Sequence, residues 1–464
     1  MTARFLHDRA VGALVGAAVG DALGVPYEFG SRRLVPPAQM LGGGLGGYAP
    51  GQWSDDTEMA VCIAQVAATG ADLRDADALD DVARGFLRWY DEGPADIGVQ
   101  TRTVLSRARR RAGRPGMVLT GVAAELHAET GRTAGNGSLM RTAPVALAHL
   151  DDPDALEQAA RAVSALTHAD PAAGDACVLW CSAIAHAVRT GELDVRVGLP
   201  RVAPPWAALL DAAEAGEPAS FADNGWVVAA LQAAWSAVSR AASFDDGLQR
   251  AVAAGHDTDT VAAIAGGLLG ARYGVSAVPS RYRRLVHGWP GLRSRDLAAL
   301  ALLTVRGGRP DPDGWPTGPR LHYGRTHRGT VPHPDDPGVL LGGVGALVPG
   351  VADAVVSLCR LGAEEVPLQG VAPQDHVEVW LVDAEDANAD LRTVLDDAAD
   401  AVRDLRAEGK TVLLHCVHAH TRTPVVAAVH GARVAGGSER EALQRVMAVL
   451  PSARPRASIA AALR

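Results

Sequence analysis

Two short acidic segments, far apart in the sequence, carry the side chains best suited to binding cations. Each segment directly precedes an apolar run, so its carboxylates fall in the first turn of a predicted helix, where capping residues belong. Capping explains either segment alone, but it needs one carboxylate, and each segment supplies two together with a hydroxyl. Such sets of hard oxygen ligands suit Mg²⁺ or Mn²⁺. The candidate ligands are Ser54, Asp55 and Asp56 in the first segment and Asp257, Asp259 and Thr260 in the second.

A cysteine and an arginine with five residues between them form a second candidate site. Cys416 follows an apolar predicted strand, and Arg422 begins a predicted helix, within the sequence VLLHCVHAHTRT. This arrangement resembles the signature of dual-specificity phosphatases. The resemblance implies a loop whose amides and helix N-terminus surround a phosphate and favour the thiolate. It also implies that Arg422 binds phosphate oxygens bidentately and that Thr423 assists the cysteine.

Two further positions bear on this phosphatase-like site. Asp383 lies 33 residues before Cys416 (416 minus 383) and matches the place of the general acid, with Asp386 as its rival. The family loop usually has glycine three residues after the cysteine, whereas this chain has Ala419. If that position needs an unusual backbone conformation, alanine costs stability or reshapes the loop.

The elements that must position these residues fall into two regions. Residues 8 to about 306 are mostly Ala/Leu/Val-rich segments broken by Gly, Pro and Asn, which predicts a mostly helical domain over residues 1–306. Residues 307–337 lack an apolar period and are predicted to be a linker. Residues 338–464 alternate short apolar strands with helical stretches, which predicts a small α/β domain with a largely parallel sheet. The predicted strands cover residues 338–341, 377–382 and 411–415.

Composition narrows the class of protein. Hydrophobic residues make up 48% and charged residues 21%, which are typical values for a soluble globular protein. The net charge of -9 argues against a broad nucleic-acid-binding surface. The apolar stretch from residue 10 to 25 is interrupted by Asp21 and predicts a buried helix, and no apolar run reaches membrane-spanning length. Five scattered cysteines predict reduced thiols and a cytoplasmic location.

Five segments occur in the order and approximate spacing of the ADP-ribosylglycohydrolase family. The chain resembles the bacterial enzymes related to the dinitrogenase reductase-activating glycohydrolase over about residues 8 to 306. The resemblance implies an all-α bundle with two divalent cations between the acidic segments. It also implies hydrolysis that removes ADP-ribose from a modified protein or another conjugate. The five segments are Gly12–Gly30 (GALVGAAVGDALGVPYEFG), residues 54–59 (SDDTEM), Gly135–Pro144 (GNGSLMRTAP), Leu166–His168 and Gly255–Gly270 (GHDTDTVAAIAGGLLG).

The same resemblance assigns roles near the metals, each with a simpler alternative. Glu28 would act as an acid/base or water-positioning group, and Asp55 belongs to the catalytic set; a solvated loop carboxylate is the alternative for Glu28. His168 would contact the ribose or a phosphate, although a lone histidine beside a helix is usually structural. Backbone N–H groups would face the diphosphate or ribose, unless the glycine-rich segment is a plain turn. These groups belong to Gly135, Asn136, Gly137 and Ser138.

Two departures from the family pattern accompany these roles. Ser54 stands where threonine is usual and keeps the ligand oxygen, while His256 replaces a usual glycine and puts the local turn geometry in doubt.

Three functions remain open at this point. The chain is a hydrolase of ADP-ribosyl conjugates joined to a phosphatase, or an ADP-ribose-binding module joined to a phosphate-reading domain without turnover. The third is a metal-dependent phosphohydrolase, whose product is inorganic phosphate rather than free ADP-ribose.

Overall fold

The computed structural model describes residues 3–324 and 326–464, which fall into two compact units. The first unit holds Met1–Val278 and Leu285–Arg309. The second unit holds Pro310–Arg464 and, in addition, the short segment Pro279–Arg284 from the middle of the chain.

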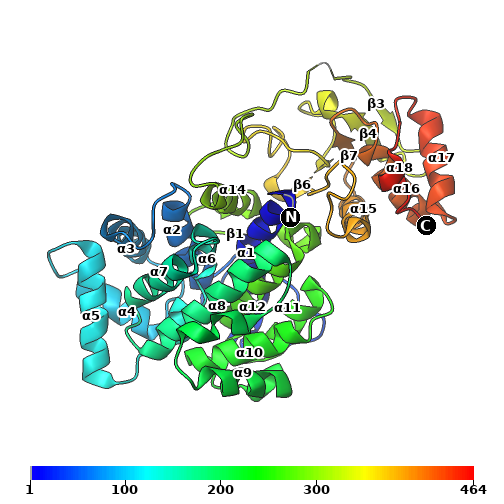
Figure 1. Cartoon of the computed structure of the whole chain (residues 1–464). Helices are drawn as coiled ribbons and strands as arrows, with labels where there is room; N and C mark the ends of the chain where they lie inside the picture. The colour runs from blue at the N-terminus through cyan, green and yellow to red at the C-terminus, as the bar shows by residue number, and fades with distance from the viewer. Residues whose placement is uncertain (1–2, 325) are drawn as a thin grey trace. The chain divides into compact units, whose positions relative to one another are not determined.

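The first unit is a helical bundle with a short antiparallel strand pair, β1 (His287–Gly288) and β2 (Leu292–Arg293) (Figure 1). The predicted mostly helical domain is thus confirmed. Its helices are α1 (Ala3–Gly24), α2 (Asp55–Ala67), α3 (Ala76–Asp91), α4 (Val99–Ala108), α5 (Pro115–Thr130), α6 (Ala143–Ala148), α7 (Pro153–Ala165), α8 (Pro171–Thr190), α9 (Trp206–Ala215), α10 (Val227–Ser239), α11 (Phe244–Val252), α12 (Thr258–Tyr273) and α14 (Ser294–Val305).

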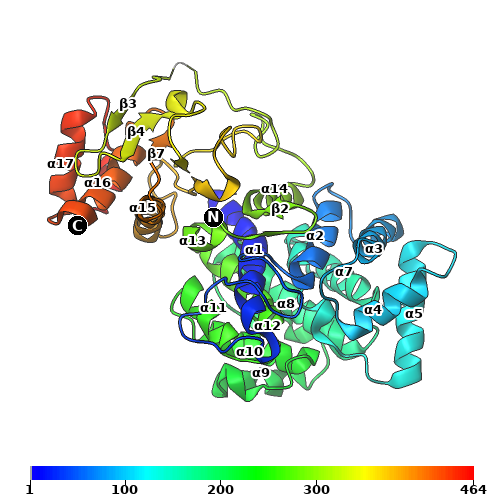
Figure 2. The ribbon, with the colours of Figure 1, turned by 180° about the vertical axis from the view of Figure 1, so that it is seen from behind.

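Helices α1 and α12 pack against each other through glycines spaced four residues apart. They lie side by side in both views of the ribbon (Figures 1 and 2). A Cβ added to Gly16 would lie 2.4 Å from the carbonyl oxygen of Gly266, and one added to Gly20 would lie 2.0 Å from that of Ala262. At Gly24 an added Cβ would lie 2.4 Å from the Cα of Asp259. The helices are therefore antiparallel at backbone contact, and the end of α1 meets the start of α12.

We expect Gly20→Ala to destabilise the first unit by about 1–3 kcal/mol or more, because the methyl group has only backbone atoms to displace. Urea or thermal unfolding of the full chain would measure the change. Gly121→Ala is the matched control, since no atom lies within 4 Å of an added Cβ at that position in α5. There alanine should be neutral or stabilise by about 0.5–1 kcal/mol through helix propensity. Equal effects at the two positions would contradict the close-contact argument.

Two helices in the described part of the chain are long and apolar enough to cross a membrane by composition alone. They cover Phe5–Gly30 and Pro171–Thr190, and their most apolar windows are 100% and 72% buried inside the structure. The prediction that no stretch reaches this length is therefore wrong, because small apolar residues around Asp21 keep the average hydropathy high. Core helices of folded proteins pass the same test.

The second unit contains a five-stranded sheet in the order β3-β4-β7-β5-β6. Strands β4, β7, β5 and β6 are parallel, and the edge strand β3 runs antiparallel to β4. The predicted parallel sheet is confirmed, but β3 lies inside the predicted linker, β5 was not predicted, and the strand expected at residues 377–382 is shorter. The strands are β3 (Thr330–Pro332), β4 (Val339–Gly343), β5 (Ala354–Ser357), β6 (His376–Glu378) and β7 (Val412–Cys416).

The two faces of this sheet are covered differently. Successive side chains of β7 point to opposite faces of the sheet. Val412, Leu414 and Cys416 belong to the hydrophobic core on one face, and Leu413 belongs to the core on the other. The larger core includes the helices that follow the strands, and the smaller core is closed by loop residues such as Leu368. The helices of this unit are α13 (Ser280–Arg283), α15 (Leu391–Ala407), α16 (Arg422–Ala435), α17 (Glu439–Val449) and α18 (Ala457–Ala460).

The predicted linker, residues 307–337, is for the most part folded into the second unit. The indole of Trp315 lies under the guanidinium of Arg360 (3.8 Å to the ring centroid) and 5.8 Å from the ring of Trp380. Arg360 also forms an ion pair with Asp311 (2.8 Å). The segment lacks an apolar period because isolated aromatic and charged contacts hold it.

Ion pairs fix the short mid-chain segment of the second unit. Arg283 pairs with Asp397 (3.0 Å), and Arg284 pairs with Asp375 (3.1 Å) and Glu408 (2.7 Å). Both arginine side chains are about nine-tenths buried. The predicted boundary after residue 306 therefore misses a piece of the second unit that lies earlier in the chain.

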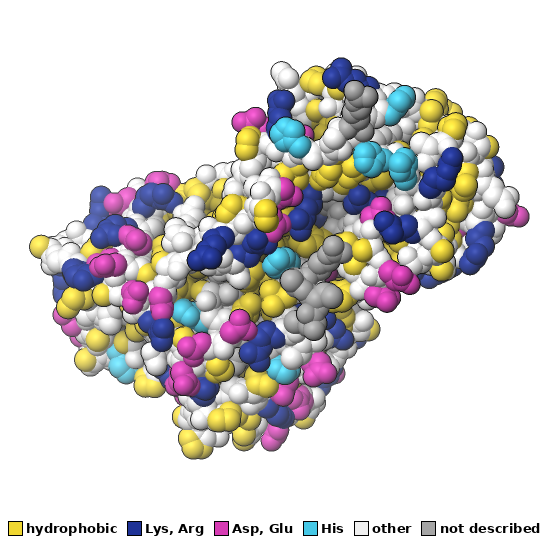
Figure 3. Space-filling view, turned by 45° about the horizontal axis from the view of Figure 1, so that its top comes forward, with side chains coloured by type: hydrophobic (Ala, Val, Ile, Leu, Met, Phe, Trp, Pro, Cys, Tyr) yellow, Lys and Arg dark blue, Asp and Glu magenta, His cyan; other side chains and the backbone are white. Residues whose placement is uncertain are grey.

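Side chains of both charge signs are interspersed on the face drawn in Figure 3, where dark-blue Lys and Arg alternate with magenta Asp and Glu. This face carries no broad field of one sign, whereas an extended nucleic-acid surface is a basic field.

Candidate metal centre and candidate phosphate loop

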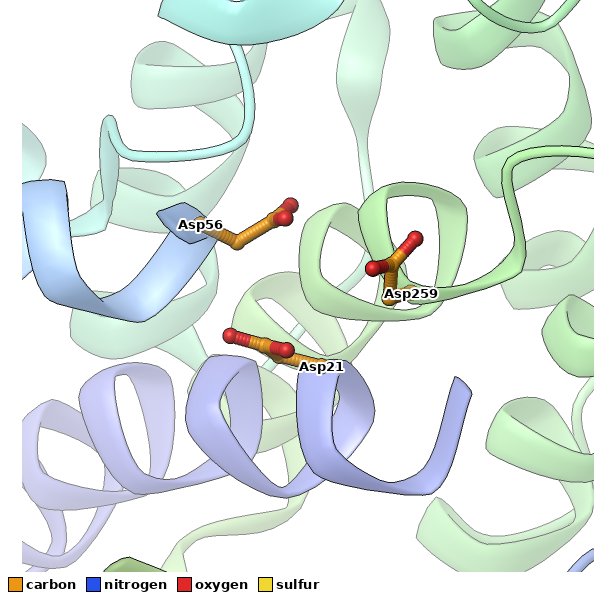
Figure 4. A group of neighbouring side chains, drawn as sticks. All are labelled: Asp21, Asp56 and Asp259. Atoms are coloured by element: carbon orange, nitrogen blue, oxygen red, sulfur yellow. The ribbon is translucent and has the colours of Figure 1, made fainter. Parts of the chain in front are cut away.

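The two acidic segments meet in the first unit, as the sequence predicts. Carboxylate oxygens of Asp21, Asp56 and Asp259 all lie within 4.8 Å of one another, and so do those of Glu28, Asp257 and Asp259. The side chains of the first group come from α1, α2 and α12 and face a common space (Figure 4). Asp259 belongs to both groups, so the carboxylates form one continuous cluster that could hold two cations.

Asp21 is the residue of this cluster that the sequence prediction missed. Its fully buried carboxylate accepts hydrogen bonds from the backbone N–H and hydroxyl of Ser54 (2.9 and 2.8 Å) and from those of Thr57 (3.1 and 2.6 Å). It thus caps the start of α2 from outside and fixes the first acidic segment against α1. The sequence carried one hint, a charged residue inside the apolar stretch from residue 10 to 25, but this hint does not identify the partner of Asp21.

The two carboxylate oxygens of Asp56 have different surroundings. Its Oδ2 lies 3.1 Å from the hydroxyl of Ser54 and 3.4 Å from the hydroxyl of Thr260. Its Oδ1 is buried and has no hydrogen-bond partner among the residues that the structure describes. A buried carboxylate oxygen without a donor is costly, and a divalent cation would satisfy it. The residues present therefore fit the metal centre that the sequence predicts.

Two asparagines hold Asp257 at the other side of the cluster. The side-chain amide of Asn136 donates to Asp257 Oδ2 (2.7 Å) and to the carbonyl of Asn224 (2.9 Å). The Asn224 side chain in turn accepts from the backbone N–H of Asp257 (3.1 Å). Asn224 was not predicted from the sequence, and Asn136 supports a carboxylate through its side chain.

The predicted substrate-binding loop, residues 135–138, is partly committed to internal contacts. The backbone N–H of Asn136 donates to the carbonyl of Gly225 (3.2 Å), so the prediction that this group faces the substrate is wrong. The hydroxyl of Ser138 accepts a hydrogen bond from Ser164 (2.9 Å) and is buried. Roles for the remaining N–H groups of this loop stay predictions.

His168 is buried beside the glycines of that loop. Arg141 donates to the hydroxyl of Thr167 (2.7 Å), and this hydroxyl lies 2.7 Å from Nδ1 of His168. Burial lowers the pKa of His168 to about 3, so the ring stays neutral. A Cβ on Gly135 or Gly137 would lie 3.4 or 3.1 Å from this ring. His168 thus presents a neutral imidazole at the loop.

Backbone strain sits directly beside two of the carboxylates. Phe29 follows Glu28 in the 3-10 helix η1 (Val25–Gly30) with φ of 43°, and His256 precedes Asp257 with φ of 59°. The backbone N–H of Phe29 donates to the carbonyl of His256 (2.6 Å). Left-handed conformations are unfavourable for residues with a side chain. The position that His256 occupies therefore does need the conformation that glycine adopts most easily.

Burial and mutual repulsion raise the pKa values of the clustered carboxyl groups. Desolvation first, and then the negative charge of Asp257, raise the pKa of Glu28 to about 8. Desolvation and the charge of Asp96 raise the pKa of Asp55 to about 8, and desolvation raises the pKa of Asp21 to about 6. Asp96 is a further carboxylate near the cluster that the sequence prediction missed. Without cations, the cluster therefore holds protons that ordinary carboxyl groups release.

These raised pKa values predict that the metal-free first unit loses stability as the pH rises. A carboxyl group whose folded pKa lies above its unfolded value of about 4 binds more protons when folded, so the free energy of unfolding falls between the two values. We expect the calorimetric melting temperature, measured on the full chain without divalent cations, to fall from about pH 5 to about pH 8. Mg²⁺ or Mn²⁺ should raise it, and more at the higher pH, because protons compete with cations for the same oxygens.

Two aspartate variants provide the control for this measurement. Asp259→Asn should lose most of the cation-dependent rise, whereas Asp151→Asn, which removes an exposed carboxylate, should respond like the wild type. An undiminished cation response in Asp259→Asn would contradict a metal centre at this cluster.

The second unit places Cys416 and Arg422 at the ends of one short loop between β7 and α16. The loop borders a pocket of about 450 Å³. Ala419 has φ of 56°, so the position where the phosphatase pattern usually has glycine does adopt the conformation that glycine favours. The pocket is lined by Asp383, Cys416, Val417, His418, His420, Thr421, Arg422, Arg454 and Arg456.

Arg422 is oriented by two backbone carbonyls. Its Nη1 donates to the carbonyl oxygens of Leu358 (2.5 Å) and Leu381 (3.2 Å). Its Nε is buried without a hydrogen-bond partner in the described structure and lies 3.8 Å from a carboxylate oxygen of Asp383. The guanidinium is therefore held in place while part of it still lacks an acceptor, as expected for a group that binds an anion.

The structure distinguishes the two candidates for the general acid. Asp383 lines the pocket and accepts a hydrogen bond from Arg456 (2.9 Å), whereas Asp386 is exposed and does not line it. Thr423 is fully buried, and its hydroxyl donates to the carbonyl of Gly342 (3.4 Å). Assistance of Cys416 by Thr423 stays a prediction.

A chain of hydrogen bonds leads to the backbone of Cys416. Nδ1 of His376 accepts from the N–H of Leu368 (3.0 Å), so its Nε2 carries the proton and donates to the Ser357 hydroxyl (2.8 Å). That hydroxyl donates to Nε2 of His415 (2.7 Å), which leaves Nδ1 of His415 to donate to the carbonyl of Cys416 (3.4 Å). Burial lowers the pKa of His415 to about 4, so the chain stays neutral and keeps this direction.

Comparison with known proteins places the first unit. The family model for ADP-ribosylglycohydrolases matches residues 2–312. The chain therefore belongs to the ADP-ribosylglycohydrolase family, and its relatives are hydrolases of ADP-ribosyl conjugates.

Two relatives and one solved structure illustrate the similarity. ADP-ribosylarginine hydrolase Tri1 of Pseudomonas putida is 32% identical over 59% of this chain and 73% of the relative. ADP-ribosyl-[dinitrogen reductase] glycohydrolase of Rhodospirillum rubrum is 31% identical over 60% of this chain and 90% of the relative. A solved ADP-ribosylglycohydrolase-related protein complex has 32% sequence identity and a TM-score of 0.53, covering 66% of this chain and 99% of its own.

Proposed function

We propose that the first unit uses two divalent cations, Mg²⁺ or Mn²⁺, to hydrolyse the bond between ADP-ribose and an arginine side chain. The observation that carries this proposal is the convergence of carboxylates from α1, α2 and α12 around a buried oxygen of Asp56 without a hydrogen-bond donor. The arginine linkage is proposed from the relatives, one of which is an ADP-ribosylarginine hydrolase. Ser54, Asp55, Asp56, Asp257, Asp259 and Thr260 would be the ligands, with Asp21 fixing the first segment from behind.

The reaction breaks the bond between the anomeric carbon of the ribose and a guanidinium nitrogen. The oxygen of a water molecule becomes bonded to that carbon, and one of its protons goes to the leaving nitrogen. Divalent cations supply positive charge that orients the ribose hydroxyls and acidifies water. Glu28 is buried beside Asp257 and Asp259, so its carboxyl group can take the proton from the attacking water and pass it to the leaving nitrogen. His168 would contact a ribose or phosphate oxygen.

Two variants of the full chain test this mechanism. Glu28→Gln should lower the rate of ADP-ribose release by about 10²-fold or more with little loss of ADP-ribose binding, because the amide cannot carry the proton. Asp257→Asn should abolish release, while Asp151→Asn should leave it unchanged. Free ADP-ribose from ADP-ribosylated arginine, followed by chromatography with Mg²⁺ or Mn²⁺, is the measurement.

The products also separate the competing functions. Release of inorganic phosphate without free ADP-ribose would favour a metal-dependent phosphohydrolase. ADP-ribose binding without any product would reduce this unit to a binding module. Hydrolysis of a serine-linked conjugate in preference to arginine would overturn the proposed linkage.

For the second unit we propose a phosphatase-like domain whose loop from Cys416 to Arg422 binds an oxyanion. The loop joins a buried strand to the N-terminus of a 14-residue helix, where backbone N–H groups and the helix dipole favour an anion. The buried Nε of Arg422 without a hydrogen-bond partner supports the same role. Turnover would use Cys416 as nucleophile and Asp383 as general acid, which lines the same pocket.

Phosphate release from aryl phosphates tests turnover at this loop. We expect Cys416→Ser to reduce release to background, because the serine hydroxyl is a far weaker nucleophile than a thiolate. Cys359→Ser is the matched control, since it changes the other cysteine of the unit, which does not line the pocket. Equal release by wild type and Cys416→Ser would leave the domain as a phosphate-binding module, and failure of phosphate or tungstate to bind would remove that role too.

A further inference from the structure

We propose that the pocket over Cys416 recognises a small molecule with two phosphate groups, one bound by the loop and the other by Arg454 and Arg456. The inference rests on the proposed oxyanion role of the loop and adds the class of ligand. It starts from a feature that lies outside the Cys-Arg signature: two arginines of the C-terminal segment line the pocket together with Arg422.

Backbone hydrogen bonds attach this C-terminal segment to the loop. The N–H of Arg454 donates to the carbonyl of His420 (2.7 Å), and the hydroxyl of Thr421 donates to the carbonyl of Arg454 (3.4 Å). The segment follows α17 and is separated from the loop by α16 and α17 in the chain. Its position at the pocket is thus fixed by the same loop residues that would surround the first phosphate.

The two arginine side chains are oriented but still have donors to offer. Arg454 uses Nη1 to donate to the carbonyls of Pro451 (2.8 Å) and Ala453 (2.6 Å). Arg456 uses Nε to donate to Asp383 (2.9 Å), and its side chain is 60% exposed. The other guanidinium nitrogens of Arg454 and Arg456 form no hydrogen bonds with residues that the structure describes. Both guanidinium groups can therefore bind an additional anion.

Donor groups and size both exceed what a single phosphate requires. The loop amides and Arg422 can satisfy one phosphate, yet the pocket also presents the guanidinium groups of Arg454 and Arg456. The volume of about 450 Å³ falls in the range of pockets that hold small organic ligands. A second phosphate would accept hydrogen bonds from Arg454 and Arg456, so a bisphosphorylated small molecule fits both observations.

Matched sugar phosphates test this inference on the full chain in the Cys416→Ser background, which prevents turnover. Calorimetric titration would compare fructose 1,6-bisphosphate with fructose 6-phosphate at constant ionic strength. We expect the bisphosphate to bind about 10-fold tighter or more. In Arg454→Ala/Arg456→Ala this preference should disappear, with a change of less than about 3-fold for the monophosphate. Arg440→Ala, which removes an exposed charge on α17 outside the pocket, should keep the preference.

The outcomes separate the two levels of the argument. If the monophosphate binds but the bisphosphate is not preferred, or if the double variant keeps the preference, the second phosphate site is wrong and the oxyanion loop stands. If neither sugar phosphate nor inorganic phosphate binds, the oxyanion role of the loop fails and the inference fails with it.

Discussion

The backbone contact between α1 and α12 is the constraint on which the carboxylate cluster depends. Asp21 lies in the last turn of α1, Glu28 lies in η1 directly after it, and Asp257 and Asp259 lie at the start of α12. These groups meet because the two helices approach at glycine distance. The carboxylates themselves repel one another. The apolar faces of both helices, buried almost throughout, supply the opposing force. Packing therefore holds a charge arrangement that would separate on its own.

The sequence predicted the residues of the carboxylate cluster better than the residues that support them. Paired carboxylates before helices identified Asp56, Asp257 and Asp259, because ligand type and helix position are local features. Asp21 and Asn224 act through hydrogen bonds to residues distant in sequence, so no local pattern identified them. The same limit applies to residues 307–337, whose aromatic and ionic contacts are made to positions further along the chain.

His256 and Ala419 both stand where glycine is expected, but their surroundings compensate the backbone strain to different extents. His256 is exposed, so burial of its side chain does not compensate the cost of its left-handed backbone. Its carbonyl accepts a hydrogen bond from the N–H of Phe29, so the two strained residues, which adjoin Asp257 and Glu28, are bonded to each other. Ala419 is buried, and its methyl group joins the core of the second unit, which offsets part of a cost of about 1–2 kcal/mol. Strain of this kind persists where surrounding contacts determine the backbone, and both positions adjoin candidate sites.

The position of Pro279–Arg284 in the chain affects the order in which the parts of the second unit are synthesised. During synthesis the ribosome would produce this segment directly after α12, long before the sheet that it belongs to exists. Arg284 can pair with Asp375 only after another 91 residues have been synthesised. Since domains form as their residues emerge, the first unit can close while the second still lacks its partners for this segment. The second unit therefore includes a segment that lies between the two pieces of the first in sequence, and a gene encoding residues 310–464 alone would encode it without one of its parts.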